Sequence, residues 1–117
     1  MLVKNYGHNI KIKIVLEGKM KYFIVEGILN NSDNMNEAIM KEHMSYTQKA
    51  MDEGKILLSG LKKDMSGGIF IIKTESIKIL EEYLSKEPFK VYGIQDYKFI
   101  EFDPHYINEF PSTWGIK

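Results

Sequence analysis

The fold is decided by residues 43–89, at whose centre the chain reads Gly54-Lys55-Ile56-Leu57-Leu58-Ser59-Gly60, then Asp64-Met65-Ser66-Gly67-Gly68, then Ile69-Phe70-Ile71-Ile72. The two apolar runs predict neighbouring strands over residues 55–60 and 68–73, and the glycines between them permit the positive φ angles of a hairpin loop. An amphipathic segment lies on each side of the pair. The stretch therefore predicts helix, strand, turn, strand and helix.

The helix before the hairpin is predicted over residues 35–53. Asn34 with Glu37 resembles a capping box at its start, and Gly54 supplies the glycine that commonly follows a helix. Four side chains recur at the spacing i, i+4, i+7 and i+11, which predicts one stripe facing a sheet, with His43 beside it. This stripe consists of Met40, Met44, Thr47 and Met51.

The second helix begins after Thr74 or Ser76, either of which can cap it, and ends near residue 87. Pro88 stops this helix because proline restricts the residue before it to extended geometry. Glu87 is therefore expected at a helix C-terminus, where its negative charge is unfavourable for the helix dipole and invites a partner.

One further strand is predicted on each side of these helices. Residues 20–26 are aromatic and β-branched, and Gly27 is expected to stop that strand. Residues 95–102 alternate around Tyr97 and Phe99. In residues 20–26 and 68–73 both faces are largely apolar, so something is expected to cover each face of the sheet.

The predicted order is β-α-β-β-α-β, an α+β ferredoxin-like unit. Two helices cover only one face of a four-stranded sheet, and the other face needs a partner. A second copy of the same sheet is the economical answer, which predicts an isologous homodimer formed sheet to sheet.

Three segments are expected along the chain. Residues 1–19 are interpreted as an N-terminal extension, with Met20 as a natural start; the alternative is an added edge strand, because residues 11–14 alternate strictly. Residues 20–102 form the domain. Residues 103–117 form an aromatic C-terminal tail, in which Asp103-Pro104 predicts a short turn of helix closed by Pro111. The aromatic side chains Phe102, Tyr106, Phe110 and Trp114 predict that the tail docks on the domain or on a partner chain.

Composition excludes several functional classes. The 117 residues contain 16 basic and 16 acidic side chains, all the basic ones are lysine, and this neutral balance argues against a nucleic-acid partner. The apolar runs are too short to span a membrane. The chain has no cysteine, which excludes disulfides and thiolate metal sites, and it lacks the features of a secretory signal. A cytoplasmic location is the expectation.

The chain resembles the YciI-like (YCII-related) domain family over about residues 20–102. The resemblance is carried by the first strand, by His43, by residues 51–60, by Asp64 with Gly67-Gly68, and by Pro88-Phe89 with Gly93. It implies a dimeric α+β barrel and acid–base chemistry by a histidine and an aspartate on small, often aromatic, molecules. His43 matches the family histidine, whereas the family aspartate falls on Glu87, so the carboxylate is kept but is longer by one methylene. Leu61 stands where the family usually has a proline.

The candidate site residues are His43, Glu87 and Asp64. A histidine can accept and donate a proton near neutral pH, and a neighbouring carboxylate fixes its tautomer and stabilises the imidazolium. For each residue an ordinary role is also open: a backbone hydrogen bond for His43, a solvated charge paired with Lys86 or Lys90 for Glu87, and capping of its own loop for Asp64. His8, His43 and His105 have no metal-ligand spacing, so a metal site is not expected. No cofactor is expected either, and Gly67-Gly68 lacks the pattern of a phosphate-binding loop.

Two functions are consistent with these residues. The first is a cofactor-free enzyme in which His43, oriented by Glu87 or Asp64, catalyses isomerisation or elimination of a small organic molecule. The second is a non-catalytic dimeric module that binds a small molecule or a partner.

Overall fold

The computed structural model describes residues 20–108. Residues Met20–Phe102 form one compact unit, in which the chain order is β-α-β-β-α-β with two short additional helices. This α+β ferredoxin-like arrangement is the one predicted from the sequence. The elements are β1 (Lys21–Leu29), η1 (Ser32–Asn34), α2 (Glu37–Asp52), β2 (Ile56–Leu61), β3 (Gly68–Thr74), α3 (Ile77–Ser85), α4 (Pro88–Val91) and β4 (Gln95–Phe102).

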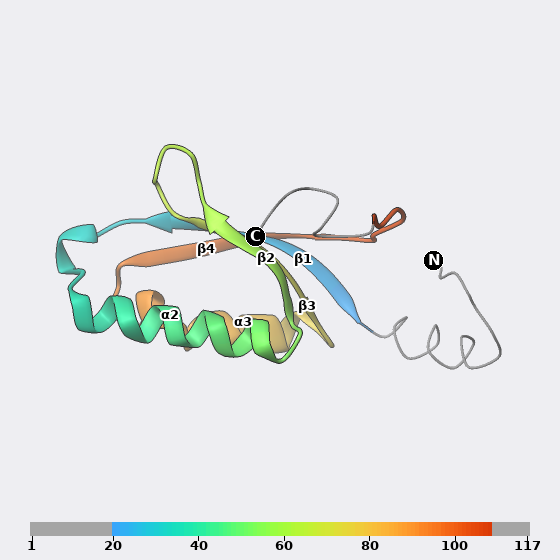
Figure 1. Ribbon diagram of the computed structural model, residues 1–117, viewed down its shortest axis with the longest axis horizontal. Coiled ribbons are helices and arrows are strands. Elements are labelled where there is room, and N and C mark those ends of the chain that lie inside the picture. The colour runs from blue at the N-terminus through green and yellow to red at the C-terminus, as the bar shows by residue number, and fades with distance from the viewer. Residues whose placement is uncertain (1–19, 109–117) are drawn as a thin grey trace. The chain divides into compact units, whose positions relative to one another are not determined.

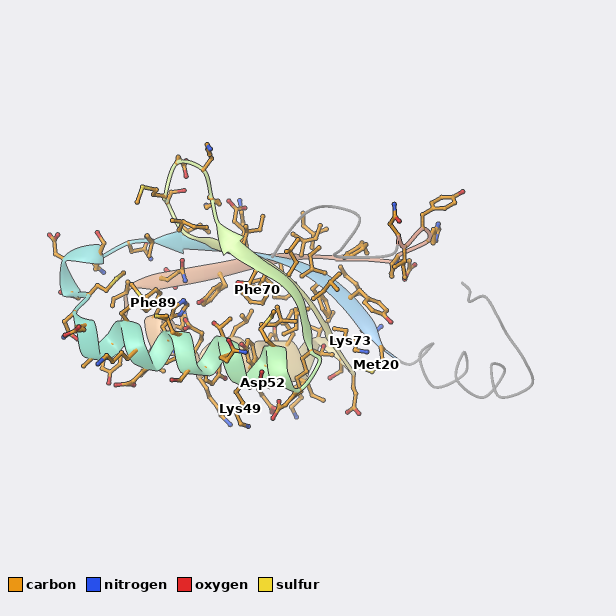
Figure 2. All side chains as sticks on the ribbon, in the orientation of Figure 1. Met20, Lys49, Asp52, Phe70, Lys73 and Phe89 are labelled. Carbon is orange, nitrogen blue, oxygen red and sulfur yellow. The ribbon has the colours of Figure 1, made fainter. Side chains whose placement is uncertain are left out.

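The four strands form an antiparallel sheet in the order β2-β3-β1-β4. The helices α2 and α3 lie on one face of this sheet (Figure 1). The core lies between the helices and the sheet. Alternate residues of the central strands contribute to it, with Phe23 and Val25 of β1 and Ile72 of β3 at most 1% exposed. Leu80 of α3 is fully buried in the same core. Phe70 from the sheet and Phe89 from α4 lie in the same layer (Figure 2).

A second, smaller apolar cluster lies at one end of α2. It consists of Ile39, Phe89 and Ile94, with Leu29, Met35 and Met40 packed against it. Phe89 can reach this cluster because α4 begins at Pro88, directly after α3 has ended. This cluster supports the side of α2 that carries His43.

The predicted end of the first strand at Gly27 is wrong, because β1 continues through Gly27 to Leu29. A Cβ atom at Gly27 would overlap the side-chain amide of Gln95 on the neighbouring strand β4. The glycine is therefore needed inside the strand for close approach, and it does not interrupt the hydrogen-bonded ladder.

The predicted capping box at the start of the first helix is also wrong. Asn34 belongs to η1, and Asn36 caps α2 by accepting a hydrogen bond from the backbone N–H of Ile39 at 2.9 Å. The far end follows the prediction: Gly54, with φ of 75°, takes the left-handed conformation that ends the helix.

The predicted methionine stripe faces the sheet only in part: Met40 packs against the smaller apolar cluster and Thr47 is half-buried, whereas the other two side chains are exposed. Met44 is 60% exposed and Met51 is 37% exposed, whereas Ile39 and Ala50 are buried with His43 between them. Both stripes have helical spacing, so periodicity alone could not choose between them. Ala50 belongs to the main core, together with residues of β1, β2 and β3, so the side of α2 that carries Ile39, His43 and Ala50 is the one that faces the sheet.

The short helical turn predicted at Asp103-Pro104 is wrong over residues 103–108, which are neither helix nor strand. Unlike the short helix α4, whose Pro88 and Phe89 are buried, residues 105–108 are exposed, so no packing offsets the cost of helix nucleation. The predictions for residues 1–19, and those for Phe110, Pro111 and Trp114, lie outside the described residues. Among residues 20–108, no helix is both long and apolar enough to cross a membrane.

Candidate functional site

His43 lies on the inward face of α2, and its side chain is 27% exposed. Its ring is stacked on the ring of Phe89, with centroids 3.8 Å apart and planes 4° apart. Phe89 is itself 5% exposed and is held in the smaller apolar cluster. Stacking on Phe89 therefore fixes the plane of the imidazole ring.

Glu87 contacts His43 directly, through its Oε2 atom and the Nδ1 atom of the imidazole. The carboxylate is almost fully buried, with the residue 2% exposed. Leaving a buried carboxylate without partners costs several kcal/mol, so its surroundings must supply hydrogen bonds. The alternative of a solvated charge paired with Lys86 or Lys90 does not hold, because Lys90 pairs instead with Asp96 at 2.6 Å.

Glu87 is not at the unfavourable helix end that the sequence predicted. It follows the C-cap of α3 and is the N-cap of α4, with φ of −67° and ψ of 130°. Its Oε1 accepts a hydrogen bond from the backbone N–H of Phe89 at 3.1 Å. A negative charge is favourable at a helix N-terminus, so α4 stabilises this carboxylate.

Two side chains of β4 complete the surroundings of Glu87. The hydroxyl of Tyr97 donates to Glu87 Oε1, and Nε2 of Gln95 donates to the Tyr97 hydroxyl oxygen at 2.9 Å. Burial and then the nearby charge of Glu87 raise the pKa of Tyr97 well above its usual value, so this hydroxyl keeps its proton. Gln95 is 3% exposed and accepts a hydrogen bond from the backbone N–H of Gly68 at 3.1 Å.

Sequence reasoning missed both Tyr97 and Gln95 as members of this site. A usable signal was present: Gln95 begins a strand whose alternate residues Tyr97 and Phe99 face the core. A glutamine on such a face must find hydrogen-bond partners among other buried groups. Its partners come from β3 and from its own strand, and they were not evident in the sequence.

A small cavity of about 50 Å³ lies beside the His43–Glu87 pair. A cavity of this size holds a few water molecules, whereas a cavity of roughly 150 Å³ is known to bind benzene. An aromatic ligand would therefore require the cavity to open further. The lining residues are His43, Thr47, Ser59, Gly60, Gly68, Ile69, Phe70, Tyr83, Glu87, Gln95 and Tyr97.

Asp64 is exposed in the β2–β3 hairpin loop and does not line this cavity. Its Oδ1 accepts hydrogen bonds from the Ser66 hydroxyl at 2.6 Å and from the Ser66 backbone N–H at 3.0 Å. The Ser66 side-chain hydrogen bond, followed by the backbone one, lowers the pKa of Asp64. The structure thus brings His43 and Glu87 together and leaves Asp64 in its capping role.

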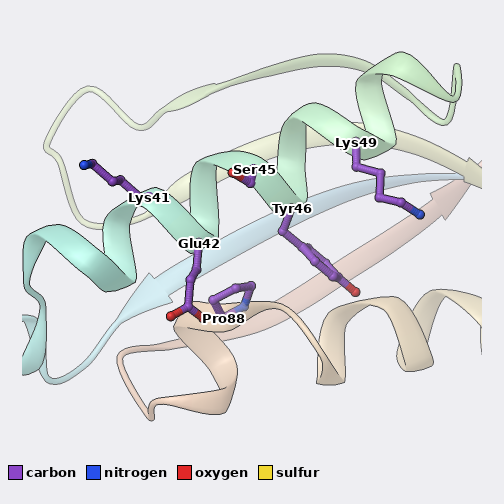
Figure 3. Close-up of a pocket in the computed structure, with 6 residues that line it drawn as sticks. All are labelled: Lys41, Glu42, Ser45, Tyr46, Lys49 and Pro88. Carbon is purple, nitrogen blue, oxygen red and sulfur yellow. The ribbon is translucent and has the colours of Figure 1, made fainter.

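A wider but shallow hollow of about 510 Å³ lies between α2 and the segment that contains α4 (Figure 3). It is lined by Lys41, Glu42, Ser45, Tyr46, Lys49 and Pro88. Tyr46 extends from α2 across this hollow and donates a hydrogen bond to the backbone oxygen of Tyr83 at 2.7 Å. Burial and the charge of Glu87 raise the pKa of Tyr46 to about 12. Neither His43 nor Glu87 lines the hollow, so it is a surface feature separate from the buried pair.

Among residues 20–108, no group of three or more histidine, aspartate and glutamate side chains is placed so that it could hold a metal ion.

Comparison with known proteins gives a family match over most of the unit. The model of the YCII-related domain matches residues 20–103, which confirms the resemblance seen in the sequence. No curated protein matches the chain.

Two solved structures are similar in fold. The first is 5-chloro-2-hydroxyhydroquinone dehydrochlorinase from Burkholderia phenoliruptrix AC1100 in complex with 2,5-dihydroxybenzoquinone, with a TM-score of 0.55 and 15% sequence identity over 70% of this chain and 93% of that one. The second is a conserved protein of unknown function from Bacteroides thetaiotaomicron VPI-5482, with a TM-score of 0.43 and 12% identity over 71% of this chain and 95% of that one. At these identities the likeness to the dehydrochlorinase shows the fold alone.

Proposed function

This chain belongs to the YCII-related domain family, and from that premise we propose that it is a cofactor-free enzyme that moves a proton on a small organic molecule. The observation that carries the proposal is the contact between the buried Glu87 carboxylate and Nδ1 of His43. A histidine held in this way by a carboxylate has the arrangement of a general base. Asp64 has no part in the proposal, because its side chain is committed to the hairpin loop.

In the proposed reaction, Nδ1 of His43 carries a proton toward Glu87 and Nε2 is the atom that acts on the substrate. Nε2 removes a proton from a carbon made acidic by a neighbouring carbonyl or enol. The imidazolium that forms is stabilised by the Glu87 carboxylate. In an isomerisation the proton returns to a different atom of the substrate. In an elimination the electron pair of the broken C–H bond forms a double bond, a leaving group departs as its anion, and His43 later loses the proton to water.

The cavity lining favours a small and largely uncharged substrate. It presents the aromatic rings of Phe70, Tyr83 and Tyr97. Among the described residues that line it, the ionisable side chains other than tyrosine are His43 and Glu87. The dehydrochlorinase of similar fold was solved with 2,5-dihydroxybenzoquinone, which makes hydroxylated quinones and hydroquinones the first compounds to test.

We further propose that the chain forms a homodimer through the face of the sheet that the helices leave uncovered. That face carries Tyr22, Ile24, Leu58, Ile69, Ile71 and Ile100. Ile100 is 66% exposed and Ile69 is 39% exposed in the single chain, so a substantial apolar surface is open to water. An exposed patch of this kind is typical of an interaction surface.

A binding module without turnover is the second candidate, and the small volume of the cavity is the observation that favours it. A space of about 50 Å³ is too small for a ring-sized substrate, so catalysis on such a substrate requires the cavity to open. A smaller molecule could bind without this opening. In that case the His43–Glu87 pair would serve as a hydrogen-bonding group for the ligand.

The two functions are separated by a turnover assay with chlorinated and unchlorinated hydroxyhydroquinones, followed by absorbance and by chloride release. We expect the wild type to be active, and His43→Gln and Glu87→Gln to lose at least about a hundredfold of kcat/KM, as is typical of removed general acid–base catalysis. Asp64→Asn is the matched control and should remain active. Binding of 2,5-dihydroxybenzoquinone that weakens in the two site variants, without turnover of any of these compounds, would favour the module.

A further inference from the structure

A continuous row of hydrogen bonds joins the β2–β3 hairpin to the imidazole of His43. It begins at the backbone N–H of Gly68, which donates to Gln95 Oε1 at 3.1 Å. Gln95 Nε2 donates to the Tyr97 hydroxyl oxygen at 2.9 Å, and the Tyr97 hydroxyl donates to Glu87 Oε1. Glu87 Oε2 then contacts His43 Nδ1.

The first member of the row determines the direction of all the others. A backbone N–H can only donate, so Gln95 must present its carbonyl oxygen to Gly68 and its NH₂ group to Tyr97. The NH₂ group in turn can only donate, so the Tyr97 oxygen accepts and its single proton is directed to Glu87. The orientation of the Gln95 amide therefore follows from the backbone N–H of Gly68, which can act only as a donor.

At Glu87 this direction separates the two carboxylate oxygens. Oε1 receives two donors, the Tyr97 hydroxyl and the backbone N–H of Phe89. Oε2 is the oxygen that contacts His43. A carboxylate only accepts hydrogen bonds, so the proton of a neutral His43 lies on Nδ1 and the lone pair lies on Nε2.

We infer that Tyr97 and Gln95 are positioning residues, which hold Glu87 so that His43 keeps its proton on Nδ1 and presents Nε2 as a base. The inference rests on the proposed function in that it takes Nε2 as the atom that receives the substrate proton. It goes beyond that function because it assigns the orientation of the pair to two β4 side chains and to one backbone N–H of β3.

The side-chain amide of Gln95 lies in a confined space. A Cβ atom at Gly27 would overlap the Gln95 side-chain amide, and one at Gly67 would overlap the backbone of Gly27. A Cβ atom at Gly67 would also lie 3.0 Å from Gln95 Oε1, so the amide lies close to the backbone at both glycines. Among the described residues, no buried side-chain nitrogen or oxygen lacks a hydrogen-bond partner, so the row is complete.

The decisive variant is Glu87→Gln, because a glutamine amide has one accepting end and one donating end. Tyr97 and Phe89 both donate to the position of Oε1, so the amide oxygen must lie there and the NH₂ group must face Nδ1. Nδ1 is then forced to accept, and the proton of His43 moves to Nε2. We expect the wild type to be the Nδ1–H tautomer and Glu87→Gln to be the Nε2–H tautomer. Two-bond ¹H–¹⁵N spectra of the full chain at a pH of about 8.5, where histidine is ordinarily neutral, distinguish the two.

A second substitution tests Tyr97 itself. Adding Tyr97→Phe to Glu87→Gln removes one of the two donors that hold the amide oxygen, so the tautomer ratio should move back toward Nδ1–H by roughly tenfold, the effect of one hydrogen bond. Tyr83→Phe is the matched control, since it removes a hydroxyl from the same cavity wall without altering the row. The double variant with Tyr83→Phe should keep the Nε2–H tautomer.

The inference is overturned if His43 in Glu87→Gln stays in the Nδ1–H form, or if Tyr97→Phe and Tyr83→Phe change the ratio equally. If Glu87→Gln does not fold, the exchange of the Nδ1–H proton with water is measured in the single variants. Tyr97→Phe should accelerate this exchange roughly tenfold and Tyr83→Phe should not; equal rates would contradict the inference. These measurements need no substrate, so absence of turnover would refute the proposed function and leave the row of hydrogen bonds intact.

Discussion

The imidazole of His43 lies flat on the ring of Phe89, with 3.8 Å between the centroids and 4° between the planes. Nδ1 is at the same time held by Glu87, the residue two positions before Phe89. One short segment of chain therefore fixes both the plane of the imidazole and its rotation within that plane. The placement of Nε2 follows from these two restraints together.

Replacing Phe89 should allow the His43 ring to tilt while its contact with Glu87 is kept. In Phe89→Leu the apolar volume is largely kept and the stacked face is lost, so we expect a fall of about 1 kcal/mol in the free energy of unfolding. The NMR signals of the His43 ring should broaden or shift in the same variant. Phe99→Leu is the matched control, because Phe99 packs edge-on against Phe23 in the main core. His43 signals that are unchanged in Phe89→Leu would contradict this reading.

Gly27 should be the least replaceable of the strand glycines. Gly27→Ala places a Cβ atom against the Gln95 amide, and we expect it to lower the free energy of unfolding by about 1–3 kcal/mol, as overpacking does. Gly60→Ala is the control, since a Cβ atom there meets nothing within 4 Å. Urea denaturation measures both variants. Equal midpoints would show that β4 moves away from β1 at no cost.

The free energy of unfolding should fall as the pH rises through the alkaline range. The pKa values of Tyr97 and Tyr83 are raised by burial, and that of Tyr46 is raised to about 12, so the folded state holds these protons more tightly than the unfolded state does. Their contribution is fully present below the usual tyrosine pKa of about 10 and is lost as the pH rises above it, at up to about 1.4 kcal/mol per pH unit for each group.

The contribution of Tyr97 to this alkaline slope can be isolated. Between about pH 10 and 11.5, the free energy of unfolding of Tyr97→Phe should decline less steeply than that of the wild type. Tyr106→Phe, at a side chain that is 98% exposed, should decline as the wild type does. Parallel slopes for the wild type and Tyr97→Phe would show that this hydroxyl is not the source.

The homodimer is tested on the uncovered face of the sheet. Ile71 of β3 is paired with Ile24 and Leu58 in the centre of that face, so Ile71→Lys should convert the dimer to a monomer in sedimentation experiments. Met44→Lys, on the exposed side of α2, carries the same change of charge and should leave the dimer intact. A wild type that sediments as a monomer at micromolar concentration would refute the proposal.

Local patterns predicted most of the fold. The strand over residues 95–102 and the hairpin strands appear within one residue of their predicted bounds, and Ser76 caps α3 as one of the two proposed residues. These features depend on alternation, on glycines and on caps, which are properties of neighbouring residues. The prediction failed at Gly27, where a glycine usually read as a strand end is required by a residue 68 positions later in the chain.

The candidate site was predicted only in part. His43 and Glu87 were named from the family resemblance, and they are in contact. The sequence predicted the wrong environment for Glu87, because the four-residue helix α4 that follows it was too short to show periodicity. Asp64, named alongside them, lies elsewhere because its own loop offers it nearer hydrogen-bond donors.

Spacing along the chain was sufficient to predict the order of the elements, the antiparallel hairpin and the apolar character of both sheet faces. Spacing could not reveal which stripe of α2 is buried, which carboxylate contacts His43, or that Tyr97 and Gln95 lie around Glu87. The reason is physical: the direction of a hydrogen bond and the orientation of a helix are set by contacts between distant segments. Those contacts form only when α2, α4 and β4 are packed together in the folded domain.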